Sequence, residues 1–383
     1  MKHQKNRFDH LITQRSVNFR AAGASLILFL LLAATACQKS ETIAPSGSSD
    51  QNSFDLKLSH ANNYEQVNLV ADVVDEYNPQ HIDPNLVNAW GMAFDDEGEI
   101  WVSSADKGLS TIYNDNGQTL MPPVNIPFGM NANGGAPTGI VYNATSDFTI
   151  LGTNEPSEFI WATENGTIAA WNDPAGSNAV IVANNSSSGA VYKGLTMGKN
   201  GGANYLYATN FKQAKIDVFD ASFNSVNMPF NDPNMPAGFA PFNIKYLDGK
   251  LYVTYAKQLA PDNEDDEAGP GNGFVDIYNT DGSFVQRFIS QGRLNSPWGI
   301  AKAAGTNVIG IGNFGDGRIN IYNSNGTFSM TLKKDGAPLE IEGLWAIVFP
   351  GKNLPDNERN RLYFTAGPDE ESHGLFGYIK PAQ

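Results

Sequence analysis

The sequence has 383 residues but only one cysteine, Cys37, and five histidines. A single cysteine excludes an intramolecular disulfide, so the fold must be stabilised by its hydrophobic core. Basic residues are also scarce, because 25 Lys and Arg face 40 Asp and Glu, which gives a net charge of −15. A chain this acidic repels phosphate backbones, and it contains no basic stripe. We therefore expect no nucleic-acid partner.

Several signatures of catalysis are missing. The sequence has no G-x-S-x-G elbow, no H-E-x-x-H helix and no C-x-x-C pair. Beyond the first 37 residues the histidines are His60, His81 and His373. His373 has the chemistry of a general base, but without a recognisable partner the structural interpretation is the better one. Long apolar runs with a 3.6-residue period are absent, so we expect few and short helices.

The N-terminus predicts export. Residues 1–36 combine a basic stretch with the apolar run "AAGASLILFLLLAATA", and Cys37 follows directly. This arrangement resembles a bacterial lipobox, except that Ala34 stands where Leu is usual. It implies a lipid on Cys37 and a membrane-anchored lipoprotein of the cell envelope. Plain secretion and an uncleaved membrane anchor are the alternatives. Residues 37–63 are polar and predict a flexible tether.

A pattern of short apolar strands recurs six times between residues 64 and 383. One copy reads "AWGMAF", "EIWVSSADKG" and "STIYNDNG", and another reads "PTGIVY", "FTILGTNEP" and "GTIAAWNDPAG". Equivalent first-strand positions lie 47 to 56 residues apart, at Gly91, Gly139, Gly194, Asn243, Gly299 and Ala346. Four short antiparallel strands at this spacing are typical of a β-propeller blade. Residues 64–383 are therefore predicted to form one all-β, six-bladed propeller.

The ends of the chain predict how the ring closes. The sixth copy stops at Ile379 before a fourth strand, whereas the apolar run Val67–Val73 precedes the first copy without a partner. We expect this run to pair beside Gly374–Ile379 as the missing outer strand of the last blade, which also removes an exposed edge. Two separate three-bladed sheets are the alternative, but they leave that run unexplained.

Two resemblances support this fold. Pro297, Gly299, Ile300 and Ala301 match the "P-x-G-I-A" that opens NHL-type repeats. The longer phrases "DPNLVNAWGMAF", "LNSPWGIA", "GNFGDGRIN" and "LYFTAGPDEESHGLFGYI" resemble a functionally uncharacterised family of exported bacterial six-bladed propellers. The resemblance implies the fold and the export, and it supplies no catalytic residue.

In a propeller, the loops before each first strand and after each second strand open on one face around the channel. These loops predict an acidic and aromatic face, with ligand-contacting candidates Trp90, Trp298, Trp345, Glu342 and Arg318. The three tryptophans either form a rim for a sugar or peptide or wedge between the blades. Arg318 either clamps a ligand carboxylate or pairs with Asp316 to fix its own turn.

A hard cation is a further hypothesis for this face. Asn154, Asn210 and Asn313 follow predicted second strands, and Asp316 lies close by, so their oxygens would suit Ca²⁺. Such a site resembles that of metal-dependent lactonases of the gluconolactonase type. The insertion at 260–273, "APDNEDDEAGPGNG", is a second Ca²⁺ candidate, although its spacing is not that of an EF-hand. In both places the alternative is structural: turn-forming residues and a solvated acidic loop.

Two functions follow from these patterns. The first is an exported, monomeric binding module that holds a small molecule, a glycan or a protein at the channel face. The second is a metal-dependent hydrolase or lyase at the same place, and the fold alone does not separate them.

Overall fold

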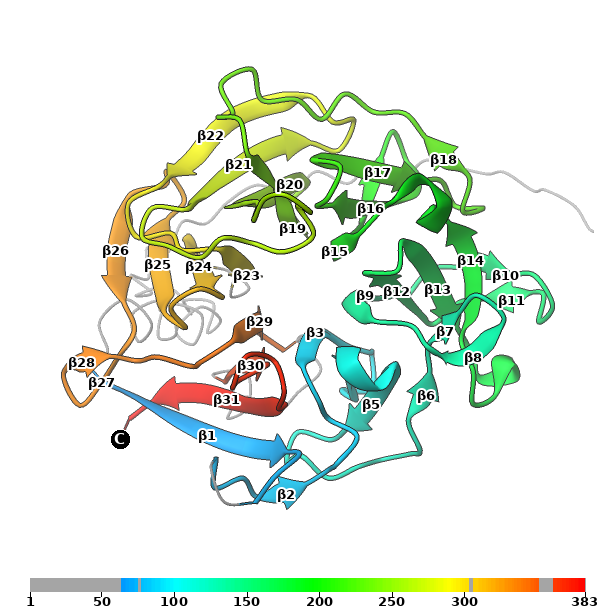
Figure 1. The fold of residues 1–383 in the computed structure, drawn as a ribbon, viewed down its shortest axis with the longest axis horizontal. Coiled ribbons are helices and arrows are strands. Elements are labelled where there is room, and N and C mark those ends of the chain that lie inside the picture. The colour runs from blue at the N-terminus through cyan, green and yellow to red at the C-terminus, as the bar shows by residue number, and fades with distance from the viewer. Residues whose placement is uncertain (1–62, 75–76, 303–305, 351–360, 383) are drawn as a thin grey trace, which may run out of the picture. The chain divides into compact units, whose positions relative to one another are not determined.

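The computed structural model describes residues 63–74, 77–302, 306–350 and 361–382. They form a six-bladed β-propeller, with the blades arranged around a central axis (Figure 1). This confirms the predicted fold class. Helix is limited, among these residues, to three short 3-10 turns at Ala105–Lys107, Asp173–Ala175 and Ser186–Ser188. In the described part of the chain no helix has the length and apolar character needed to cross a membrane.

Each blade is a four-stranded antiparallel sheet whose first strand lines the axis. Blade one consists of β3 (Ala89–Phe94), β4 (Ile100–Ser104), β5 (Leu109–Tyr113) and β6 (Val124–Asn125). Blade two consists of β9 (Pro137–Tyr142), β12 (Phe159–Thr163), β13 (Thr167–Trp171) and β14 (Val180–Asn184). Blade three consists of β15 (Tyr192–Asn200), β16 (Ala203–Asn210), β17 (Lys215–Phe219) and β18 (Ser225–Val226). Blade four consists of β19 (Phe239–Leu247), β20 (Lys250–Lys257), β21 (Gly273–Asn279) and β22 (Phe284–Ser290). Blade five consists of β23 (Pro297–Ala301), β24 (Val308–Asn313), β25 (Ile319–Asn323) and β26 (Phe328–Thr331).

The sixth blade joins the two ends of the propeller. It is built from β29 (Leu344–Val348), β30 (Leu362–Ala366) and β31 (Leu375–Pro381), and its fourth strand is β1 (Tyr64–Ala71). β1 runs antiparallel to β31, with Val67 opposite Tyr378, and β2 (His81–Ile82) adds a short parallel strand outside it. The predicted closure by an N-terminal strand is confirmed, and the alternative of two three-bladed sheets is wrong.

Blade two differs from its prediction. The segment "FTILGTNEP" is not a second strand, because it forms the small hairpin of β10 (Thr149–Ile150) and β11 (Glu155–Pro156). The second strand is β12, which pairs with both β9 and β13. The hairpin leaves the end of β9 that lies opposite the channel face described below. Two further hairpins, β7–β8 (Pro127–Phe128, Asn131–Gly134) and β27–β28 (Lys333–Lys334, Ala337–Pro338), connect successive blades.

Repeated glycines allow the first strands to crowd around the axis. A Cβ atom on Gly91 would lie 2.2 Å from the carbonyl oxygen of Thr138, and one on Gly139 would lie 2.4 Å from the amide nitrogen of Leu195. Both neighbours belong to the first strand of the next blade, so only glycine permits this approach. Along the axis the first strands leave a void of about 20 Å³, which is close to the volume that one water molecule needs. The two ends of the channel are therefore separate.

Candidate functional site

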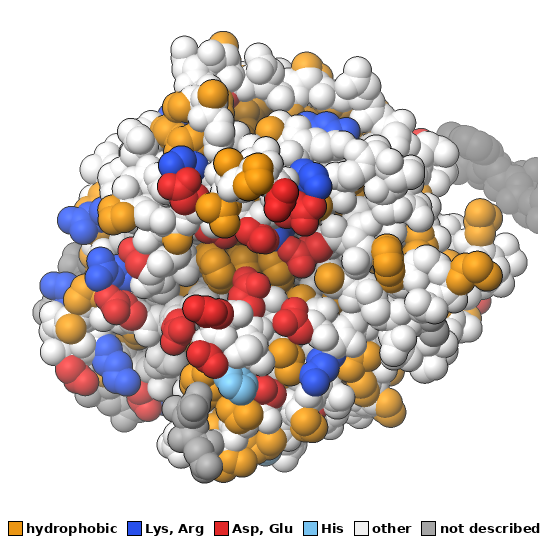
Figure 2. Space-filling view, in the orientation of Figure 1, with side chains coloured by type: hydrophobic (Ala, Val, Ile, Leu, Met, Phe, Trp, Pro, Cys, Tyr) orange, Lys and Arg blue, Asp and Glu red, His pale blue; other side chains and the backbone are white. Residues whose placement is uncertain are grey.

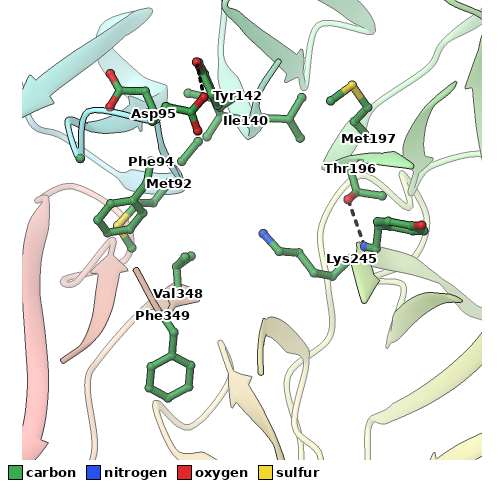
Figure 3. Close-up of a pocket in the computed structure, with 15 residues that line it drawn as sticks. Met92, Phe94, Asp95, Ile140, Tyr142, Thr196, Met197, Lys245, Val348 and Phe349 are labelled. Atoms are coloured by element: carbon green, nitrogen blue, oxygen red, sulfur yellow. Dashed lines mark hydrogen bonds between the residues drawn. The ribbon is translucent and has the colours of Figure 1, made fainter. Parts of the chain in front are cut away.

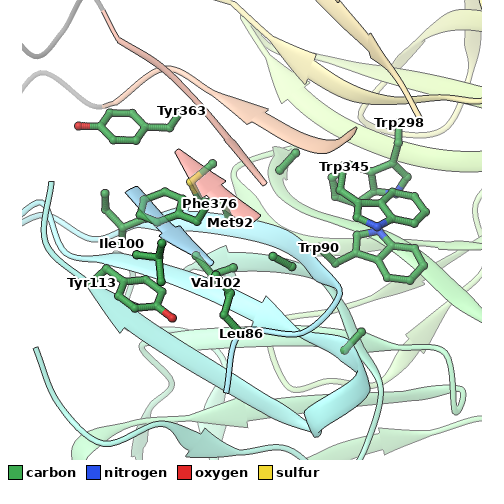
Figure 4. Packing of buried hydrophobic residues seen from close by; sticks show 14 of the residues in the cluster. Leu86, Trp90, Met92, Ile100, Val102, Tyr113, Trp298, Trp345, Tyr363 and Phe376 are labelled. Carbon is green, nitrogen blue, oxygen red and sulfur yellow. The ribbon is translucent and has the colours of Figure 1, made fainter. Parts of the chain in front are cut away.

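One end of the channel is sealed by aromatic rings. The indole of Trp345 stacks on Trp90, with ring centroids 3.8 Å apart (Figure 4). Its other face stacks on Phe314, at 4.0 Å. Trp298 meets Trp345 edge to face at 5.8 Å. Trp90 and Trp345 are each 1% exposed, and Trp298 is 4% exposed. The predicted aromatic rim is therefore wrong, because the rings pack on one another where the first strands converge, as the wedge alternative expected.

Carboxylates surround a hollow with an apolar floor on this face (Figure 2). They come from the connections after the second strands, which open here as predicted. We call the group the acidic mouth, and it comprises Asp106, Glu164, Asp265, Asp266 and Glu371 around the ammonium group of Lys193. Five of the six blades thus supply one charged group or more to the same place.

Lys193 occupies the centre of the acidic mouth. Its Nζ donates to Glu164 and lies 3.3 Å from a carboxylate oxygen of Asp265. The same atom lies 5.0 Å from the ring centroid of Trp90, and the residue is only 2% exposed. Burial alone would lower the pKa of Lys193, but Glu164 and Asp265 raise it above its ordinary value. Lys193 is therefore a fixed positive charge above the aromatic floor.

One lysine does not compensate all of this negative charge. Burial, together with the neighbouring charges of Glu164, Asp106 and Asp265, raises the pKa of Glu371 to about 7, although Lys193 acts in the opposite direction. Burial also raises the pKa of Asp266. One carboxylate oxygen of Asp266 is buried and accepts no hydrogen bond from any described residue. The acidic mouth thus holds carboxylates whose charge has no full internal partner.

The turn that carries Glu371 is strained. Asp369, Glu370 and Glu371 have φ angles of 53°, 52° and 68°. Left-handed backbone costs a non-glycine residue roughly 1–2 kcal/mol, and such strain gathers at functional sites.

The raised pKa of Glu371 also makes the stability of the fold depend on pH. Because the ordinary pKa of a glutamate is 4.5, the contribution of Glu371 to stability is fully present below that pH, and it is lost as the pH rises through about 7.

Of the predicted Ca²⁺ ligands, Asn313 and Asp316 contact each other, whereas Asn154 and Asn210 have other surroundings. Asn154 lies exposed in the β10–β11 hairpin, at the opposite end of blade two from the mouth. The buried Asn210 donates to Gln213 and Asp217, each at 2.9 Å. Asn313 donates to the carbonyl of Arg293 at 2.8 Å and to Asp316 at 2.9 Å. Asn210 and Asn313 therefore close turns in their own blades, as the structural alternative expected.

Metal ligation by acidic or histidine side chains finds no support either. Within the described ranges, no group of three or more His, Cys, Asp or Glu side chains is arranged to hold a metal ion. The 260–273 insertion is fastened by ion pairs, although the acidic side chains in these pairs stay exposed to solvent. Its acids Glu264, Asp265 and Glu267 pair with Lys212, Lys193 and Lys257, respectively. The insertion thereby lies folded against the mouth (Figure 1).

Arg318 and Glu342 lie at the periphery of this face. The guanidinium of Arg318 donates through Nε and Nη2 to Glu340, at 2.9 and 2.7 Å, and its distance to Asp316 is 4.0 Å. The predicted pairing with Asp316 is therefore secondary to the ion pair with Glu340. Glu342 is exposed and accepts the amide of Asp369 at 3.2 Å. His373 lies 2.9 Å from Asp72 on the closing blade, which agrees with its structural interpretation.

Sequence reasoning missed Glu164 and Glu371 as members of the mouth. Glu164 was overlooked because blade two was misaligned, although the Asn165–Gly166 turn after "FIWAT" marks the end of a second strand. Glu371 is the third of three consecutive acids, after Asp369 and Glu370, in the loop that follows β30. Its distinguishing property is partial burial, since Asp369 and Glu370 are exposed, and no sequence pattern predicts this difference among three adjacent acids.

The blades and their filled axis define a six-bladed β-propeller. Comparison with known proteins shows which family the chain belongs to. No family model matches it. Over 315 residues it is 33% identical to uncharacterized protein R648 of Acanthamoeba polyphaga mimivirus, covering 78% of this chain and 76% of that protein. Uncharacterized protein L690 of the same virus is 33% identical over 317 residues, covering 78% and 81%. The chain belongs to the family that contains these two proteins.

Solved structures agree on the fold. A streptogramin B lyase has a TM-score of 0.50 at 13% identity and covers 83% of this chain and 97% of its own. A structural genomics protein of unknown function from Bacteroides thetaiotaomicron has a TM-score of 0.52 at 11% identity and covers 83% and 76%. At these identities the likeness concerns the fold alone. Because the sequence relatives are viral, the bacterial and exported character stays a prediction.

Proposed function

We propose that the protein is an exported lipoprotein whose propeller binds a positively charged ligand at the acidic mouth. The observation that carries the binding role is the uncompensated charge: five carboxylates face one ammonium group, and the pKa of Glu371 is raised to about 7. A cation placed there would pair with acids that the protein itself leaves partly unpaired.

The preformed geometry also supports a binding role. Lys193 and its two carboxylate partners fix the centre of the mouth, and Lys212 and Lys257 hold the insertion beside it. A rigid site avoids the entropy cost of ordering loops when the ligand binds. The metal-dependent hydrolase or lyase is the weaker alternative, since Asn154 lies elsewhere and Asn210 and Asn313 are used in turns.

Spermidine is a suitable probe for the mouth, titrated by calorimetry at low ionic strength. We expect wild type to bind it, and Asp265→Asn to bind it about tenfold more weakly because one exposed carboxylate is lost. Glu97→Gln, an exposed acid in the β3–β4 turn at the other end of the channel, should bind like wild type. Equal affinity for all three proteins would contradict the proposal, and a strong preference for Ca²⁺ over spermidine would favour the metal-dependent alternative.

The same titration should depend on pH. Glu371 is neutral below about pH 7 and charged above it, so spermidine should bind more tightly as the pH rises through about 7. In Glu371→Gln this pH dependence should be largely lost, since the group that titrates has been removed. An unchanged pH profile in the variant would assign the dependence to another group.

The lipid anchor rests on the leader and Cys37, which lie outside the described residues. Expression in a bacterial host with labelled palmitate should give a labelled, membrane-bound protein from the wild-type gene. Cys37→Ser should give no label and should release the protein from the membrane fraction. An unlabelled wild type recovered outside the cells would instead indicate plain secretion.

A further inference from the structure

A second cavity lies at the end of the channel opposite the acidic mouth. Its volume is about 420 Å³, which falls within the range of small-molecule sites. First strands of several blades and the β3–β4 turn line it, and its walls include the apolar side chains of Met92, Phe94, Met197 and Val348 (Figure 3). The filled axis separates this cavity from the mouth.

One positive charge points into this cavity. Lys245 projects from β19, and Figure 3 shows its ammonium group directed toward the middle of the space. Its backbone is held firmly, because Lys245 pairs with Tyr252 across the sheet and the next amide, of Tyr246, donates to Thr196 at 3.1 Å. No described residue forms an ion pair or a hydrogen bond with the ammonium group. Burial lowers the pKa of Lys245, which is the expected effect on a cation without a partner.

The two acids of the cavity are used elsewhere. Asp95 accepts the amides of Glu97 and Glu99 at 2.9 and 2.8 Å, which closes the β3–β4 turn. Asp96 accepts the hydroxyl of Tyr142 at 3.4 Å. Figure 3 places Asp95 on the wall across from Lys245. These acids disfavour a ligand with two or more negative charges, so the complementary ligand carries one.

We propose that this cavity binds a small organic monocarboxylate, with its anionic head at Lys245 and its apolar body against Met92, Phe94, Met197 and Val348. A carboxylate supplies the counter-charge and the hydrogen-bond acceptors that the ammonium group lacks. Binding is also favoured because the apolar body of the ligand is removed from water when it packs against these walls. This site is independent of the proposed cation site at the other end of the channel.

Octanoate and 1-octanol form a matched pair of probes, because they share an apolar chain and differ in charge. Titrated into the full-length protein, octanoate should bind wild type and should bind Lys245→Met about tenfold or more weakly. Octanol should bind both proteins alike. Lys199→Met removes an exposed lysine from the neighbouring strand β15 and should leave octanoate binding unchanged.

Thermal unfolding gives a second measurement on the same proteins. Lys245→Met should melt at a higher temperature than wild type without ligand, because an uncompensated charge has been replaced by an apolar side chain of similar length. At equal concentration, octanoate should raise the melting temperature of wild type by more than that of the variant. The proposal is overturned if octanoate fails to bind folded wild type, or if wild type and Lys245→Met bind it equally. Loss of spermidine binding in Asp265→Asn would leave these results unaffected, so the two sites can fail separately.

Discussion

Val70→Asp is expected to lower the free energy of unfolding by about 3–5 kcal/mol, because it places an unpaired charge in the core. Val70 is fully buried in β1, opposite Phe376 of β31, on the strand that closes the ring. Its side chain belongs to the same apolar cluster as Trp90 and Trp345. The substitution therefore weakens both the closing strand pair and the core of the last blade.

Urea unfolding followed by tryptophan fluorescence measures this effect. Val74→Asp is the matched control, since Val74 lies four residues further along the chain and is 63% exposed. We expect it to change stability by no more than about 0.5 kcal/mol. If Val70→Asp were as stable as this control, β1 would not be an energetically important part of the ring.

Trp345→Ala is expected to cost about 3–5 kcal/mol as well, for a different reason. The indole fills the axis between Trp90 and Phe314, and its Nε1 donates to Asn88 at 3.0 Å. Asn88 in turn donates to Asp106 of the acidic mouth at 3.3 Å. Truncation would leave a large cavity at the point where the first strands of all blades meet.

Trp345→Phe separates the two contributions of this side chain. It keeps an aromatic ring in the stack but loses the hydrogen bond to Asn88, and we expect a smaller cost, of about 1–2 kcal/mol. Leu151→Ala, at a position 88% exposed, is the control and should be neutral. Equal stability of Trp345→Ala and wild type would mean that the aromatic seal does not stabilise the ring.

The sequence was sufficient for the architecture because each blade is a local unit with its own strands and turns. The first-strand glycines, and the apolar run before the first copy, predicted the ring and its closure by β1. Blade two was misaligned because "FTILGTNEP" is apolar enough to resemble a strand. What decides its role is pairing: β12 carries the aromatic residues Phe159 and Trp161 into the core, and the hairpin lies outside the blade.

The site was harder to predict because its properties arise between blades. The sequence shows that Trp90, Trp298 and Trp345 recur at similar repeat positions, but not that they stack on each other. Lys193 and Lys245 both lie on first strands, β15 and β19. One receives two carboxylates from other blades, and the other faces a cavity without a partner among the described residues. Only the closed ring determines which lysine is compensated.

The pairing of β1 with β31 has a consequence for biosynthesis. β1 is synthesised before blades one to five, whereas its partner β31 is synthesised after them. Blades one to five consist of consecutive segments and can form as they emerge, but the sixth cannot be completed before β31 has emerged from the ribosome. Until then the nascent chain is an open arc in which the edge of β1 lacks its partner strand.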